Sequence, residues 1–145
     1  MESLEGYDQI NFWNNRAINF PDGDKITSVM EFGHWRTKKK TVKDFKGFVY
    51  LITAPTGKKY IGRKNRFVKR SKKESNWRNY CGSSKDVKAD IKRYGKESLR
   101  FEIIQFCKSL SELSIAEARE IINANALFDK NYYNKYLYIK LFAQK

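Results

Sequence analysis

Apolar and polar positions around residue 50 follow the pattern of two β-strands joined by a turn. The stretch GFVYLI (47–52) is rich in aromatic and β-branched residues, TAPTGKK (53–59) holds the proline and glycine of a turn, and KYIG (59–62) resumes the strand pattern. This pattern predicts a β-hairpin. Because residues near the turn face one another across the two arms, Tyr50 and Tyr60 are expected to lie on one patch of the sheet.

A basic stretch and a clearer helix are predicted next. The stretch RKNRFVKRSKK (63–73) has few apolar residues, and we predict a short basic helix there. A second helix is expected to begin at Ser83 or Ser84, either of which is a suitable N-cap, and to end at Gly95 as its C-cap. Its apolar line consists of Val87, Ile91 and Tyr94.

The last third of the chain predicts one strand and one long helix. The stretch SLRFEIIQF (98–106) alternates apolar with charged residues, as a strand with one buried face does. Its apolar set is Leu99, Phe101 and Ile103, and its charged set is Arg100 and Glu102. The stretch SLSELSIAEAREIINANALF (109–128) is predicted as a helix capped by Ser109 or Ser111.

The apolar face of this long helix carries a carboxylate. Glu117 lies four residues after Leu113 and four before Ile121, on the face that also holds Ala124. Burying a carboxylate without a partner is costly, so its position requires a reason. One interpretation is that the edge of the stripe is solvated and Glu117 pairs with a lysine. The other is that the carboxylate has a functional partner.

Charge adds a class of partner to this picture. The chain of 145 residues has 30 Lys and Arg against 16 Asp and Glu, a formal net charge of +14 and a pI of about 9.8. A surplus of this size favours a polyanion, and aromatic residues scattered among the charges favour nucleic acid. The alternative is a basic surface that binds nothing. No apolar run approaches a membrane span and the N-terminus lacks an export signal, so we expect a cytoplasmic protein, in the host cytoplasm if it is encoded by a phage.

The distribution of charge predicts two regions. Residues 1–24 carry a net charge of −4, whereas the rest carries +18. We predict that residues 1–46 form an N-terminal extension, acidic over 1–24 and ending in the basic connector or nucleic-acid arm HWRTKKKTVKDFK (34–46), and that residues 47–145 form one compact domain. Two cysteines and one histidine fit neither a zinc site nor a disulfide framework, so two reduced thiols are expected.

Two three-residue sequence motifs indicate a family. Val49 and Tyr50 match the last two letters of GIY, and the next strand reads YIG from Tyr60. An arginine ten residues after Tyr60 (Arg70), a helical glutamate (Glu117) and the word YYN ending in Asn134 follow in the order that GIY-YIG nucleases use. Residues 47–136 therefore resemble a GIY-YIG nuclease domain, similar to small phage-type and homing-type endonucleases. Two positions depart from the pattern, since Phe48 replaces the first glycine and Glu74 stands where many members have histidine.

The resemblance implies a fold and a chemistry. The fold is α/β (α+β), with a small three-stranded antiparallel sheet flanked by helices. The activity is DNA phosphodiester hydrolysis with one divalent cation, Mg²⁺ or Mn²⁺, held by Glu117, and no small-molecule cofactor. Arg70 would hold the scissile phosphate, although Arg63 and Arg66 compete for this role. Asn134 completes the implied catalytic set.

The two tyrosines have different implied roles that the sequence does not assign. One of Tyr50 and Tyr60 would accept a proton from the attacking water, and the other would orient water or phosphate. A phenol is a poor base at neutral pH unless cations lower its pKa, and we expect the neighbouring basic cluster to do so.

DNA contacts are expected around this pair. The candidates are Arg63, Lys64, Arg66, Lys69, Lys72, Lys73, Trp77 and Arg78. Trp77 and Tyr80 either stack on DNA or cap the core. The predicted partner is DNA, with a possible homodimer on it and no membrane. The alternative function is a catalytically inactive nucleic-acid-binding or partner-inhibiting protein on the same scaffold.

Overall fold

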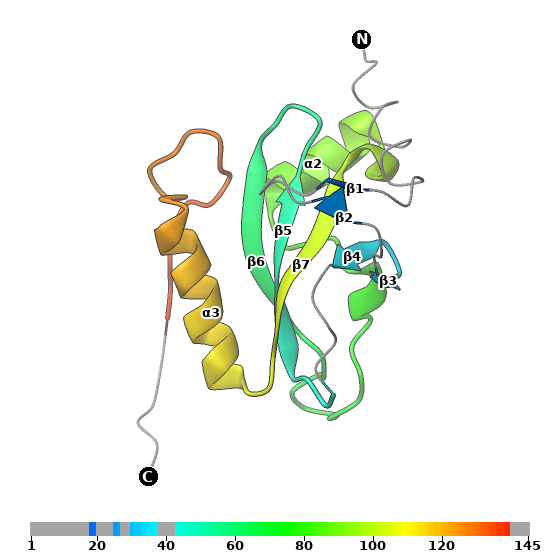
Figure 1. The fold of residues 1–145 in the computed structure, drawn as a ribbon. Coiled ribbons are helices and arrows are strands. Elements are labelled where there is room, and N and C mark those ends of the chain that lie inside the picture. Colours follow the sequence, from blue (N-terminus) through cyan, green and yellow to red (C-terminus); the bar gives the residue numbers. More distant parts are fainter. Residues whose placement is uncertain (1–17, 20–24, 27–29, 38–42, 140–145) are drawn as a thin grey trace.

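The computed structural model describes residues 18–19, 25–26, 30–37 and 43–139. Within these ranges a five-stranded sheet has the order β3-β4-β7-β5-β6 (Figure 1). Its strands are β3 (Met30–Phe32), β4 (Trp35–Thr37), β5 (Gly47–Thr53), β6 (Lys59–Asn65) and β7 (Arg100–Cys107). The helices are α2 (Lys85–Tyr94) and α3 (Leu110–Asn123), with single 3₁₀ turns at Trp77–Asn79 and Lys96–Ser98. A separate short pair is formed by β1 (Ile18–Asn19) and β2 (Lys25–Ile26).

The predicted hairpin and the following strand form the antiparallel centre of this sheet. β5 pairs with β6 on one side and with β7 on the other, both antiparallel. Alternate side chains of β5 enter two different cores, since Phe48 belongs to the cluster around Trp35 whereas Val49 belongs to the cluster under α3. Both faces of β5 are therefore buried, which explains its nearly continuous apolar sequence.

The strand count is larger than predicted because part of the expected connector joins the sheet. β3 and β4 form a second hairpin, and β4 pairs parallel to β7 at Arg36 and Glu102. Trp35 is fully buried among Phe48, Tyr50 and Phe101, and its Nε1 donates to the backbone oxygen of Trp77 at 2.9 Å. Trp35 is thus part of the hydrophobic core and residues 35–37 form a strand of the sheet, so the interpretation of residues 34–37 as a connector or nucleic-acid arm is wrong.

The predicted short helix at residues 63–73 is also wrong. β6 continues to Asn65 because Gly47, Phe48 and Val49 of β5 supply its ladder partners. A loop of residues 66–75, here called the basic loop, then leads away from the sheet. A bridge between Phe67 and Glu74 holds its two sides together.

The two longer helices are confirmed together with their N-caps, although α3 ends at Asn123 and residues 124–128 of the predicted helix form turns. The Ser84 hydroxyl accepts the backbone N–H of Val87, and α2 ends at Gly95, whose φ of 91° is a conformation that glycine adopts readily. The Ser109 hydroxyl accepts the N–H of Glu112 at the start of α3. α3 lies against β5, β6 and β7 on one face of the sheet (Figure 1). Cys81 and Cys107 are both free thiols, as predicted.

Candidate active site

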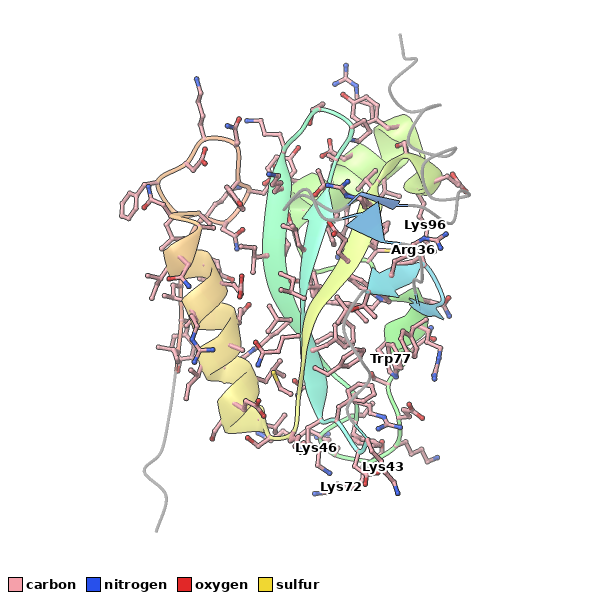
Figure 2. The ribbon with its side chains drawn as sticks, viewed as in Figure 1. Arg36, Lys43, Lys46, Lys72, Trp77 and Lys96 are labelled. Carbon is pink, nitrogen blue, oxygen red and sulfur yellow. The ribbon has the colours of Figure 1, made fainter. Side chains whose placement is uncertain are left out.

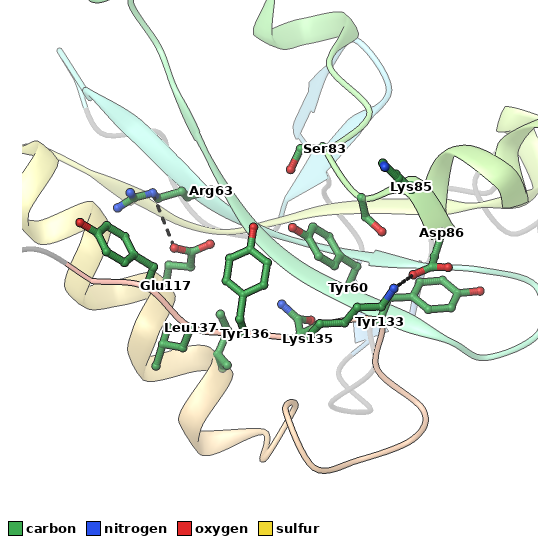
Figure 3. A pocket seen from close by; sticks show the side chains of 14 residues that line it. Tyr60, Arg63, Ser83, Lys85, Asp86, Glu117, Tyr133, Lys135, Tyr136 and Leu137 are labelled. Atoms are coloured by element: carbon green, nitrogen blue, oxygen red, sulfur yellow. Dashed lines mark ion pairs between the residues drawn. The ribbon is translucent and has the colours of Figure 1, made fainter.

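A cleft of about 530 Å³ opens at the edge of the sheet beside β6. Its walls come from β6, the beginning of α2, the middle of α3 and residues 133–138, which are far apart in the sequence (Figure 3). Three of the predicted catalytic residues line it, namely Tyr60, Glu117 and Asn134. The fold therefore brings a phenol, a carboxylate and several cationic side chains to one concave surface.

Tyr50 lies beneath this cleft, opposite a glycine. It is 1% exposed and pairs across the ladder with Gly62. A Cβ atom on Gly62 would overlap the phenol ring and oxygen of Tyr50. The glycine of the YIG word is thus required by packing, because only a residue without a side chain leaves room for the Tyr50 ring.

The two tyrosines lie on one patch, as the hairpin predicted. The ring centroids of Tyr50 and Tyr60 are 6.2 Å apart, and Tyr80 packs against Tyr50 at 6.0 Å. Tyr60 is only half-buried and faces the cleft, whereas Tyr50 is enclosed. Tyr60 is therefore the member of the pair that can reach a ligand.

The pKa values of the two tyrosines are raised, not lowered by the basic residues as the sequence predicts. Burial raises the pKa of Tyr50 well above its ordinary 10.0, and the nearby Tyr80 and Tyr60 raise this pKa further. Burial also raises the pKa of Tyr60, an effect that its side-chain hydrogen bond with Ser83 opposes. Both phenols are therefore protonated at neutral pH and are suited to donate hydrogen bonds rather than to accept a proton.

Glu117 is largely buried and pairs with an arginine, not with a lysine. Its side chain is 18% exposed, and its Oε1 lies 3.6 Å from Nε of Arg63 (Figure 3). Burial raises the pKa of Glu117, and Arg63 lowers it by a smaller amount. The negative charge facing the cleft is thus only partly compensated. Besides this ion pair, Arg63 donates a hydrogen bond from its Nη1 to the hydroxyl of Ser114 on α3.

The predicted arginine is in another part of the molecule. Arg70 is exposed in the basic loop and does not line the cleft. Arg66 is also directed elsewhere: its Nε lies 3.1 Å from Oε2 of Glu74 and its guanidinium lies over the ring of Phe45. Of the three candidate arginines, Arg63 is the one that the fold places beside Glu117.

Asn134 fastens the outer edge of the sheet. Its Oδ1 accepts the N–H of Ile61 at 3.0 Å, and its Nδ2 donates to the oxygen of Ile61 at 2.8 Å. Two backbone hydrogen bonds continue this contact, from Lys59 N–H to the Asn131 oxygen and from Tyr133 N–H to the Lys59 oxygen. The amide of Asn134 therefore satisfies the exposed edge of β6 and keeps the cleft residues in register.

The predicted DNA contacts are divided between several places. Trp77 is 1% exposed and packs in the core against Phe45 and Phe48, so its predicted contact with DNA is contradicted. Arg78 covers the ring of Trp77 from outside, and Lys64 lies over the ring of Tyr80. Three exposed lysines of the basic loop complete the set: Lys69, Lys72 and Lys73.

Several cleft residues were not predicted. The side chains of Ser83 and Tyr136 face the space between Tyr60 and Glu117, and Lys135 forms an ion pair with Asp86 at 3.2 Å (Figure 3). The serine had a signal in the sequence, because it lies next to the N-cap of α2. Tyr136 had none, since its position depends on how Asn134 attaches the C-terminal segment to β6.

Glu117 suits a hard cation, with water and phosphate as the remaining ligands. Among the described residues no group of three or more His, Cys, Asp or Glu side chains could hold a metal ion. Mg²⁺ keeps several waters and often binds through one or two carboxylates plus phosphate oxygens, so a single, only partly compensated carboxylate is an adequate protein ligand. In the same part of the chain, none of the helices has the length and apolar character needed to cross a membrane.

Comparison with known families agrees with this geometry. Residues 31–137 match the family model SegE_GIY-YIG, described as "Putative endonuclease segE, GIY-YIG domain". The chain matches no curated protein and no solved structure. The match begins within the β3–β4 hairpin and ends at residue 137, so it covers every residue that lines the cleft except Tyr138. The chain belongs to the GIY-YIG endonuclease family, whose activity is that of a DNA nuclease.

Proposed function

We propose that this protein is a DNA endonuclease that hydrolyses phosphodiester bonds in the cleft beside β6, with one divalent cation, Mg²⁺ or Mn²⁺, bound at Glu117. The observation that carries the proposal is the position of Glu117. It is a largely buried carboxylate that faces a cationic cleft, next to Tyr60 and Arg63, in a domain of a nuclease family. Burial makes its charge unfavourable, and a cation at this position would compensate it.

Four residues at or beneath the cleft have a role in this proposal: Arg63, Tyr60, Tyr50 and Asn134. A bound Mg²⁺ would supply Lewis-acid stabilisation of the charge that develops on the phosphate. Arg63 binds a phosphate oxygen through its planar guanidinium group. Its side chain is in position for this because it lies beside Glu117, the proposed metal ligand. Tyr60 donates a hydrogen bond to phosphate or to the attacking water. Tyr50 supports Tyr60 from below, and Asn134 is a positioning residue that fixes β6.

Arg63 replaces Arg70 as our proposed phosphate ligand. Its guanidinium lies at the cleft, whereas Arg70 is in the basic loop beyond the far end of β6. A role of Tyr60 as general base would require its pKa to fall when substrate binds, because burial raises that pKa in the free protein. One cleft cuts one strand, so a double-strand break would follow from two engagements or from two copies on the DNA.

The test is cleavage of supercoiled plasmid by the wild-type protein and by Glu117→Gln, with Mg²⁺ and with a chelator. We expect metal-dependent nicking that falls by about 10²-fold or more in the variant, because the proposed metal ligand is lost. Glu120→Gln is the matched control, since Glu120 is also on α3 but does not line the cleft. Equal cleavage by Glu117→Gln would contradict the proposed site. DNA binding without cleavage by the wild-type protein would favour the inactive binding protein.

A further inference from the structure

The basic loop follows the last residue of β6, Asn65, beyond the part of the strand that lines the cleft. Two β6 residues line the cleft: Tyr60 is five residues from Asn65, and Arg63 is two residues from it. At roughly 3.3 Å per residue these separations are about 17 Å and about 7 Å. The loop has a hollow of its own, about 330 Å³ in volume, which shares no lining residue with the cleft. Lys46 and Lys72, which line this hollow, are labelled at one end of the molecule in Figure 2.

This loop is closed by backbone hydrogen bonds. Val68 N–H donates to the Lys73 oxygen at 2.7 Å, Lys72 N–H donates to the Val68 oxygen at 2.8 Å, and Ser75 N–H donates to the Arg66 oxygen at 2.7 Å. The turn holds Lys72 at φ 61°, an uncommon backbone conformation for lysine. The loop therefore presents its side chains from an ordered backbone, which lowers the entropic cost of binding a ligand.

The charge of this loop is concentrated and unneutralised. Its only carboxylate, Glu74, pairs with Arg66 and also lies 3.8 Å from Arg78, outside the loop. The four remaining cationic side chains are exposed, and within the described part of the chain no ion pair joins them to a carboxylate. They are Lys69, Arg70, Lys72 and Lys73.

The hollow beside these charges has a mixed lining. Phe67, Val68 and Leu110 form an apolar floor, and three lysines surround it: Lys46, Lys69 and Lys72. The Nζ atom of Lys46 lies 5.4 Å from the centroid of the Phe67 ring. A DNA strand matches both parts of this lining. Its phosphates can pair with the lysines, and its deoxyribose rings can pack on the apolar floor.

We propose that the basic loop, with Lys46, is a second DNA contact that binds backbone phosphates of the duplex on one side of the cut. This inference rests on the proposed nuclease function of the cleft. The loop sets affinity, whereas the cleft performs the chemistry, because the hollow of the loop and the cleft share no lining residue. At about 3.4 Å per base pair, the strand separations of about 7 to 17 Å place the contacted phosphates roughly two to five base pairs from the cut.

The test measures DNA binding without cleavage, by fluorescence anisotropy of a labelled duplex in chelator over a range of salt concentrations. The loop variant is Lys69→Ala with Lys72→Asn, since asparagine tolerates the left-handed backbone at position 72. We expect roughly tenfold weaker binding and a decrease of about 2 in the salt slope, because two phosphate contacts are lost. The pair Lys88→Ala and Lys92→Ala on α2 removes the same charge from exposed lysines and should leave the slope unchanged.

Two further measurements distinguish the loss of this DNA contact from a general effect of removing charge or of disturbing the fold. Lys69→Arg with Lys72→Arg should restore affinity, and kcat at saturating DNA should be unchanged in the loop variant. Once the cut is mapped, duplexes are shortened from either end. The difference between wild-type and loop variant should vanish when one flank falls below about two base pairs, and persist when the other is shortened.

The outcomes distinguish the two proposals. An unchanged affinity and salt slope in the loop variant would overturn the second contact, as would a fall in kcat with unchanged binding. Absence of cleavage by the wild-type protein would overturn the nuclease function, while the salt slope would still test the loop.

Discussion

Arg63 and Glu117 meet across two elements of the fold, with Nε of Arg63 on β6 3.6 Å from Oε1 of Glu117 on α3. The two residues are separated by more than fifty positions in the sequence, and the contact forms because α3 packs on the face of β6 that carries Arg63. Arg63 is thereby placed at the cleft, where we propose that it binds a phosphate group.

This contact predicts which arginine is essential. We expect Arg63→Ala to lower kcat for plasmid nicking by about 10²-fold, because a charged donor to the phosphate is lost. Arg70→Ala removes the same side chain from the exposed loop and should leave kcat unchanged at saturating DNA. A large fall in kcat for Arg70→Ala, with Arg63→Ala active, would show that the arginine ten residues after Tyr60 is the catalytic one.

The buried carboxylate predicts a dependence of stability on pH. Burial raises the pKa of Glu117 above its ordinary 4.5, so the folded protein binds more protons than the unfolded chain between the two pKa values. The stability contributed by protonated Glu117 is therefore present below the unfolded pKa and lost as pH rises through the folded pKa. Glu117→Gln should melt at a higher temperature than wild-type at neutral pH, and this difference should disappear on acidification.

Thermal melting from pH 4 to 8 in chelator measures this difference. Added Mg²⁺ should then raise the melting temperature of the wild-type protein more than that of Glu117→Gln, because the cation binds the carboxylate. A melting temperature that is lower in Glu117→Gln at neutral pH would show that the ion pair with Arg63 outweighs the cost of burial.

The packing of Tyr50 on Gly62 predicts that a larger residue at position 62 destabilises the protein. We expect Gly62→Ala to lower the free energy of unfolding by about 1–3 kcal/mol, because the new methyl group overlaps the buried phenol. Urea denaturation measures this change. Lys64→Ala is the control, since it lies two residues further along the same strand and face. Equal stability of the two variants would mean that Tyr50 moves aside without cost.

The amide of Asn134 predicts a local effect on the edge of the sheet. Asn134→Ala leaves the N–H and oxygen of Ile61 without these partners, and should destabilise the protein by about 1–3 kcal/mol. Hydrogen exchange of the Ile61 amide should accelerate. Asn131→Ala is a matched control, because the bond to Lys59 uses the backbone oxygen of Asn131. Unaltered exchange at Ile61 would contradict the role of Asn134 in hydrogen-bonding the exposed edge of β6.

Local patterns were sufficient for five elements of the fold. The strand–turn–strand pattern around Tyr50 and Tyr60 gives β5 and β6, the serine caps at Ser84 and Ser109 give α2 and α3, and the alternation after Leu99 gives β7. Each pattern reflects interactions within a few residues. The GIY-YIG motifs then indicated Glu117 and Tyr60 as site residues. Both lie on these elements, and the fold brings both to the cleft.

The remaining features depend on residues that are distant in the sequence. Trp35 was assigned to a connector, yet it is fully buried because Phe48 and Tyr50 of a later strand surround it. The sequence left open whether Trp77 stacks on DNA or packs in the core. In the structure it packs in the core, against the rings of Phe45 and Phe48. Neither outcome could be read from the hydrophobicity of the tryptophan itself.

The sequence by itself determined the family, the central hairpin, both helices and the helical carboxylate, because caps and periodicity are local properties. The tertiary structure decided that residues 63–65 extend β6, since their ladder partners lie in β5. It also decided that Arg63 lies at the cleft while Arg70 lies in the basic loop. Charge alone does not distinguish these arginines, because a guanidinium is placed by the packing of the element that carries it.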